Sequence, residues 1–138
     1  MQTIASSADV SNVGLYLLNL LFTTKSVGSG SMNLALTVNA VTGVVHGQAQ
    51  GKLLAGTSHP STFSADASGV IHSTGLGTIV RTGAVKGLAF VSLPPPEIGS
   101  YQAPFSASFS LDAKGNGKGQ FTVGSHTYHD CDVSIKMS

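Results

Sequence analysis

SMNLALTVNAVTGVVHGQAQGKLL, residues 31–54, is the stretch that decides the fold class of this protein. Apolar and polar residues alternate on both sides of its centre, residues 39–43. A period of two residues is typical of β-strands with one buried face. Asn39 favours the first position of a turn through its side-chain oxygen, and Gly43 supplies a positive φ for the return into the next strand. The segment therefore predicts a β-hairpin.

The same alternation continues along most of the chain and predicts eight or nine strands. The expected strands cover residues 13–23, 31–38, 44–54, 61–66, 70–81, 85–92, 101–111, 117–123 and 127–137. The apolar run 13–22 also fits a helix, but a strand that is covered on both faces explains it equally well. We predict an all-β fold, an antiparallel meander closed into a small barrel, because closure removes the sheet edges. A two-sheet β-sandwich is the alternative.

Glycines and prolines mark the turns and connections between the strands of this meander. Asp66-Ala67-Ser68-Gly69 and Asp112-Ala113-Lys114-Gly115 repeat the turn signature of residues 39–43, so we expect hairpin turns at both. A weak repeat relates residues 43–54 to 69–80 and predicts two equivalent hairpins. Small residues at Gly47, Ala49 and Gly51 favour the barrel, since strongly curved strands need glycine where they bend.

Composition limits the organisation of the chain and the partners it can have. The protein has 138 residues, which predicts a single β-domain, over 13–138; residues 1–12 are polar, and we expect them to form a flexible segment. Only 9% of residues are charged, and the seven Lys and Arg residues do not cluster. Nucleic acid is therefore not an expected partner, because neutralising phosphates takes several converging cations. Three prolines at 94–96 predict a connection and not a central strand.

The N-terminal part of the sequence does not indicate the cellular location of the protein. No basic stretch precedes the apolar run 13–22, so no secretory signal peptide is evident. The run is also too short to span a bilayer, and we expect no transmembrane segment. The location stays open between the cytoplasm and export, and the single cysteine excludes only an intramolecular disulfide.

The heptapeptide HTYHDCD, residues 126–132, is the densest group of reactive side chains. On a regular strand His129 and Cys131 would share one face, and Asp130 would lie on the other. The cluster then splits in space, so we expect no metal site and no catalytic residue, and we predict no cofactor. Cys131 continues an apolar row and should be buried. His126, His129 and Asp130 remain candidate ligand-binding residues if they meet across a turn at 125–127.

Three further residues are candidates for ligand binding. His46 and His72 occupy matching places in the weak repeat and would bind a ligand if both faced the interior. His46 lies in a row with polar residues, which favours solvent exposure. Tyr101 offers a ring on which a ligand can stack, although tyrosines in β-proteins commonly belong to the core.

The strand and turn pattern resembles a family of small bacterial β-proteins catalogued only as a domain of unknown function. The resemblance is carried by Val13-Gly14-Leu15, Leu34-Ala35-Leu36-Thr37-Val38-Asn39, Thr42-Gly43-Val44-Val45-His46-Gly47, the stretch 88–96 and the row through Val133 and Ile135. It covers about residues 13 to 137. It implies a single β-domain and carries neither catalytic residues nor an activity.

Three functions are compatible with the sequence. The first, which we expect, is a non-enzymatic binding module for a small apolar molecule or a carbohydrate, because a small barrel with a hydroxyl-rich surface offers sites for such ligands. The second is a small barrel enzyme of the isomerase or hydrolase type that uses His and Asp. The third is a structural or oligomeric surface protein, since the strand 13–22 is apolar on both faces and predicts a homodimer.

Overall fold

Eight antiparallel strands form a closed barrel in which each strand pairs with its neighbours in the sequence. The computed structural model describes residues 14–24, 30–53, 61–76, 79–93 and 99–136. In chain order the strands are β1 (Leu15–Thr23), β2 (Ser31–Asn39), β3 (Val44–Leu53), β4 (Ser61–Leu76), β5 (Ile79–Ser92), β6 (Ser100–Leu111), β7 (Gly117–Val123) and β8 (His126–Ile135). The predicted barrel is confirmed, and residues 15–22 lie in strand β1 and not in a helix.

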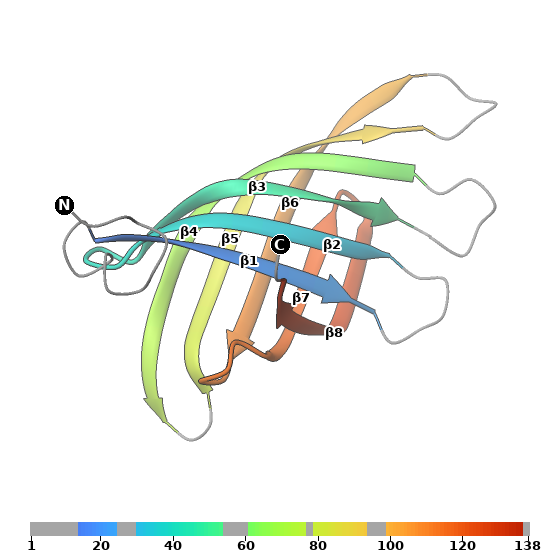
Figure 1. Ribbon diagram of the computed structural model, residues 1–138. Coiled ribbons are helices and arrows are strands. Elements are labelled where there is room, and N and C mark those ends of the chain that lie inside the picture. Colours follow the sequence, from blue (N-terminus) through green and yellow to red (C-terminus); the bar gives the residue numbers. More distant parts are fainter. Residues whose placement is uncertain (1–13, 25–29, 54–60, 77–78, 94–98, 137–138) are drawn as a thin grey trace.

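The barrel closes through a short ladder between β1 and β8. Four residue pairs, from Leu20 opposite Ile135 to Thr23 opposite Asp132, join the first strand to the last. Figure 1 shows the strands wrapped around a common interior, with the ends of β5 and β6 flaring away from the barrel near residues 93–99. This flare agrees with the register, because the β6–β7 ladder begins only at Phe105.

Alternate residues of every strand fill the interior. On β1 the even-numbered residues from Leu18 to Phe22 are buried, while Leu17 on the other face is 72% exposed. Phe121 lies near the centre of the core, with its ring 4.8 Å from that of Tyr128, 6.1 Å from Phe22 and 6.2 Å from Phe63. Buried aromatic rings of this kind contribute much of the stability of a small core.

The hairpin turns at 39–43 and 112–115 are confirmed. The Asn39 side-chain oxygen accepts hydrogen bonds from the backbone N–H groups of Val41 and Thr42, at 2.9 and 3.1 Å. Gly43 follows with a φ of 80°. Asp112 accepts in the same way from the N–H of Lys114 at 2.8 Å. In both turns the acidic or amide side chain replaces a backbone acceptor, as the sequence predicts.

The expected turn at Asp66–Gly69 is wrong, because this stretch lies in the middle of β4. The Asp66 carboxylate accepts a hydrogen bond from the backbone N–H of Leu88, at 2.8 Å, across the β4–β5 ladder. A Cβ atom on Gly69 would lie 1.9 Å from the carbonyl oxygen of Ala84. Glycine is needed here because a neighbouring backbone approaches closely, and not because the chain turns.

This correction merges two predicted strands and moves the next hairpin. The expected strands 61–66 and 70–81 are parts of β4 and β5, and the expected break before residue 85 does not exist. The predicted equivalence of residues 43–54 and 69–80 is also wrong, since Gly43 precedes β3 while Gly69 lies inside β4, opposite Val45. The remaining strand boundaries agree with the prediction to within two residues.

Several expectations fall outside the described residues. These are the flexible segment 1–12 and the connection that contains prolines 94–96. Over the described ranges all regular structure is β-strand, and no helix of the length and apolar character needed to cross a membrane occurs.

Candidate functional site

The heptapeptide HTYHDCD contains a β-bulge that changes the expected side-chain directions. Opposite Gln120 on β7, strand β8 carries two residues, His129 and Asp130. Asp130 adopts a φ of 57°, the left-handed conformation. Because of the extra residue, Tyr128 and Cys131 both pack against the core, while His129 and Asp130 are both exposed. The expectation that His129 and Cys131 share a face is therefore wrong.

The polar side chains around the bulge interact mainly with one another. The Nδ1 atom of His129 lies 3.1 Å from Oε1 of Gln120, within hydrogen-bond distance. Lys118 donates to the carboxylate of Asp132 in an exposed ion pair. An exposed ion pair contributes about 0–1 kcal/mol to stability. These partners occupy much of the hydrogen-bonding capacity beside the bulge.

Cys131 is fully buried, as the sequence predicts. Its thiol donates a hydrogen bond to the carbonyl oxygen of Tyr128, at 3.5 Å. Burial raises the pKa of the Cys131 thiol above its ordinary value of 9.0, and the negative charges of Asp132 and Asp130 raise it further. The thiol therefore stays protonated near neutral pH and is a poor nucleophile.

We expect the raised pKa of Cys131 to make part of the stability depend on alkaline pH. The folded state holds the thiol proton more tightly than the unfolded state, so this stabilisation is complete below pH 9.0 and is lost as the pH rises through the folded pKa. Urea unfolding at a series of pH values should show a steeper alkaline decline for the wild type than for Cys131→Ala. Parallel curves for the two proteins would contradict this expectation.

His46 and His72 do not form a common site. Both are exposed on the outer face of the barrel, His46 on β3 and His72 on β4. The residue opposite His46 is Ser68, four residues along β4 from His72. At the usual rise of a strand this separation is about 13 Å. The two histidines therefore do not converge on one ligand.

Tyr101 and His126 lie at one end of the barrel, each at the start of its strand. Both belong to rows that face the interior: Tyr101 pairs with the buried Val91, and His126 pairs with the buried Val123. Tyr101 is nevertheless 44% exposed. The structure thus places these two candidates on the rim, away from His46 and His72.

The ionisable groups do not gather into a metal or acid–base cluster. The four candidate groups for acid–base chemistry are exposed and lie on three different strands: His46, His72, His129 and Asp130. No three His, Cys, Asp or Glu side chains within the described ranges lie close enough together to hold a metal ion.

A groove of about 480 Å³ lies on the outer wall of the barrel. It is lined by outward-facing side chains of five consecutive strands, β2 to β6. The register places these side chains in two parallel rows that run across the strands. The first row is Ser31, Lys52, Thr62, Ser92 and Ser100; the second is Asn33, Gln50, Ser64, Phe90 and Gln102. All of these residues except Gln102 line the groove.

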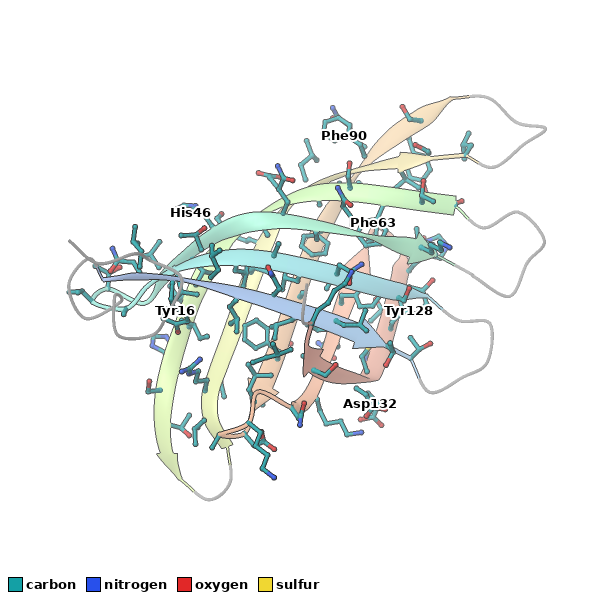
Figure 2. All side chains as sticks on the ribbon, in the orientation of Figure 1. Tyr16, His46, Phe63, Phe90, Tyr128 and Asp132 are labelled. Atoms are coloured by element: carbon teal, nitrogen blue, oxygen red, sulfur yellow. The ribbon has the colours of Figure 1, made fainter. Side chains whose placement is uncertain are left out.

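The chemistry of the groove is neutral and rich in hydrogen-bonding groups. Its outward side chains offer five hydroxyls, two amides, one ammonium group at Lys52 and one aromatic ring at Phe90. Phe90 is 49% exposed, and Figure 2 shows it on the outer side of the wall, while Phe63 lies on the inner side. None of these outward side chains is bonded to another described residue. Their hydrogen-bonding groups are therefore not occupied by other described side chains.

A second groove of about 360 Å³ lies on the wall formed by β5 to β8. It includes Lys118, Gln120 and Asp130 beside the bulge. Here Lys118 is already paired with Asp132, and Gln120 contacts His129. We therefore take the first groove as the candidate functional site, because a ligand there displaces no side-chain hydrogen bond or ion pair between described residues.

Sequence reasoning missed the residues of the first groove. Each of them is an ordinary polar residue on the outer face of a predicted strand, and none belongs to a motif. One signal in the sequence could have located part of the groove. The predicted hairpin turn at 39–43 fixes the register of its two strands and so pairs Ser31 with Lys52 and Asn33 with Gln50. Because the sequence analysis placed a turn at Asp66–Gly69, the continuation of the two rows onto β5 and β6 could not be predicted.

Comparisons with known proteins do not assign the chain to a family. No family model matches the chain, and no curated protein matches it. The resemblance to small bacterial β-proteins of unknown function therefore stays a prediction.

Proposed function

We propose that this protein is a non-enzymatic binding module that holds a neutral carbohydrate in the groove on β2 to β6. The observation that carries the proposal is the pair of cross-strand rows whose polar side chains have no partners among the described residues. Hydroxyl and amide groups both donate and accept hydrogen bonds, as the hydroxyl groups of a sugar do. The exposed ring of Phe90 supplies an apolar surface for the C–H face of a sugar ring.

The charge of the groove favours a neutral ligand. An anion such as phosphate is usually held by several cationic groups, whereas Lys52 is the single charged side chain among the described residues that line this groove. A cationic ligand would need carboxylates, and none occurs among these described lining residues. The balance of donors and acceptors thus selects a polyhydroxylated, uncharged molecule.

The packed interior argues against the apolar-molecule alternative. Buried side chains from all eight strands fill the space within the wall, and Arg81 lies over the Tyr16 ring, 5.4 Å from its centre, near one end. An apolar ligand in a barrel needs a cavity lined by such side chains. The outer groove is the better site, and its polar lining suits a sugar better than a lipid.

Removal of the Phe90 ring should weaken carbohydrate binding about tenfold, because a stacked ring contributes roughly 1 kcal/mol or more. A glycan array identifies binding sugars, and titration calorimetry then compares the wild type with Phe90→Ala. Leu88→Ala is the matched control: Leu88 is 41% exposed on the same face of β5 but does not line the groove. An array without any bound neutral glycan, or equal losses in both variants, would refute the proposal.

A second candidate function is assembly of two copies through the outer face of β1. Leu15 and Leu17 are 40% and 72% exposed there, and the strand carries no charged residue. Exposed apolar residues on an uncharged strand are typical of an interface. This candidate is independent of the groove, because β1 contributes no residue to it.

The Leu17→Lys substitution should abolish this assembly, since it places a charge at the centre of the contact. Light scattering coupled to size-exclusion chromatography should give a dimer for the wild type at high concentration and a monomer for the variant. Gln48→Lys adds the same charge at an exposed position on β3 and should leave the dimer intact. A wild type that is monomeric at every concentration excludes this function.

A further inference from the structure

The two polar rows define the shape of the ligand as well as its chemistry. Neighbouring strands lie about 4.8 Å apart, so a row across β2 to β6 extends about 19 Å. The rows are two residues apart along each strand, which separates them by about 7 Å. This outline is long and narrow, and its width is close to that of one sugar ring.

Each strand presents one side chain to each row, so the site repeats from strand to strand. Strand β2 offers Ser31 and Asn33, β4 offers Thr62 and Ser64, and β6 offers Ser100 at the far end. The repeat distance is the strand spacing, which is close to the length of one pyranose unit in an extended chain. A linear glycan across the strands would meet a similar set of donors and acceptors at every unit.

The ends of the groove limit the length of this ligand. Beyond β2 the second row reaches Leu21 of β1, which offers no hydrogen-bonding side chain, whereas the first row continues to the hydroxyl of Thr23. Beyond β6 the two rows have no continuation on β7, because the β6–β7 ladder begins only at Phe105. The described residues that line the groove come from five strands, β2 to β6, and Phe90 lies on the fourth of them.

We infer that the groove binds an extended, β-linked neutral oligosaccharide of about five units, with its chain running across the strands and one sugar over each strand. This inference rests on the proposed function and specifies its ligand. An extended chain is required because the rows cross the sheet in one direction, whereas an α-1,4-linked glucan curls away from such a surface. Phe90 stacks on the unit over β5, and the amide of Asn33 binds the unit over β2.

Calorimetric titration with β-1,4-linked gluco-, manno- and xylo-oligosaccharides of two to six units tests the inference, with maltohexaose as the curled control. In at least one series we expect the affinity to rise about tenfold or more from two to five units and to change less than about twofold beyond five. Maltohexaose should bind about tenfold more weakly than the six-unit member of that series.

Two variants locate the ends of the ligand. Asn33→Ala should remove the gain in affinity from the last unit and leave the shortest sugars unaffected, whereas Phe90→Ala should weaken every sugar that reaches β5. Affinity that is independent of length in all three series, or an equal affinity for maltohexaose, overturns the inference while the proposed carbohydrate function stands. The absence of binding to any neutral glycan on an array refutes the proposed function itself.

Discussion

Truncation of Phe121 to alanine is expected to destabilise the protein by about 3–5 kcal/mol, which corresponds to a fall in melting temperature of roughly 10–20 °C. Phe121 is fully buried, and its ring contacts three other rings, those of Phe22, Phe63 and Tyr128. These partners come from β1, β4 and β8, so the wall cannot collapse onto the cavity from one side alone. Chemical unfolding monitored by circular dichroism measures the loss.

The Phe121→Leu variant provides a graded control for this result. Leucine keeps most of the apolar volume, and we expect it to cost less than half as much as alanine. A loss below about 1 kcal/mol for Phe121→Ala would contradict the packed interior, because an already hollow or hydrated barrel would lose little on truncation.

The Gly47→Ala substitution should cost about 3 kcal/mol, the upper end of the range for overpacked interiors. The added Cβ would lie 1.8 Å from the carbonyl oxygen of Ala35 and 2.9 Å from the Cα atom of Leu36. Both are backbone atoms of β2, so the conflict cannot be relieved by a rotamer change. The measurement is again the free energy of unfolding in urea.

The neighbouring Gln48→Ala variant is the control for Gly47. Gln48 is exposed on the same strand, and its loss should change the stability by no more than about 0.5 kcal/mol. If Gly47→Ala and Gln48→Ala were equally stable, β2 and β3 would not approach each other as closely as the barrel requires.

Most of the fold could be predicted because its signals are local. Alternation identified the strands, and the side chains of Asn39 and Asp112 identified two turns through hydrogen bonds to residues two or three positions away. The stretch Asp66–Gly69 has a similar sequence for another reason. Asp66 accepts a hydrogen bond from β5 and Gly69 lets the backbone of β5 approach closely, and β5 lies more than ten residues later in the chain. A short stretch of sequence therefore does not show whether such residues form a turn or contact a neighbouring strand.

The candidate site was less predictable than the fold. HTYHDCD attracted attention because its reactive residues are adjacent in sequence, yet the bulge at His129 and Asp130 directs both into solvent. The groove residues are separated in the chain and meet only through four successive ladders from β2 to β6. Polar residues such as Ser64 and Gln50 carry no chemical signature until the register makes them neighbours.

The sequence by itself determined that the chain forms strands, which residues of the regular strands are buried and that Cys131 belongs to the core, because a period of two residues assigns side chains to a face wherever no bulge interrupts it. Only the tertiary structure decided the register. Pairing of consecutive strands placed Phe90 beside Ser64 and assembled the groove, and the pairing of β1 with β8 closed the barrel. Register depends on contacts between strands, which alternation within one strand does not specify, and a shift of one residue would exchange the buried and exposed faces of a strand.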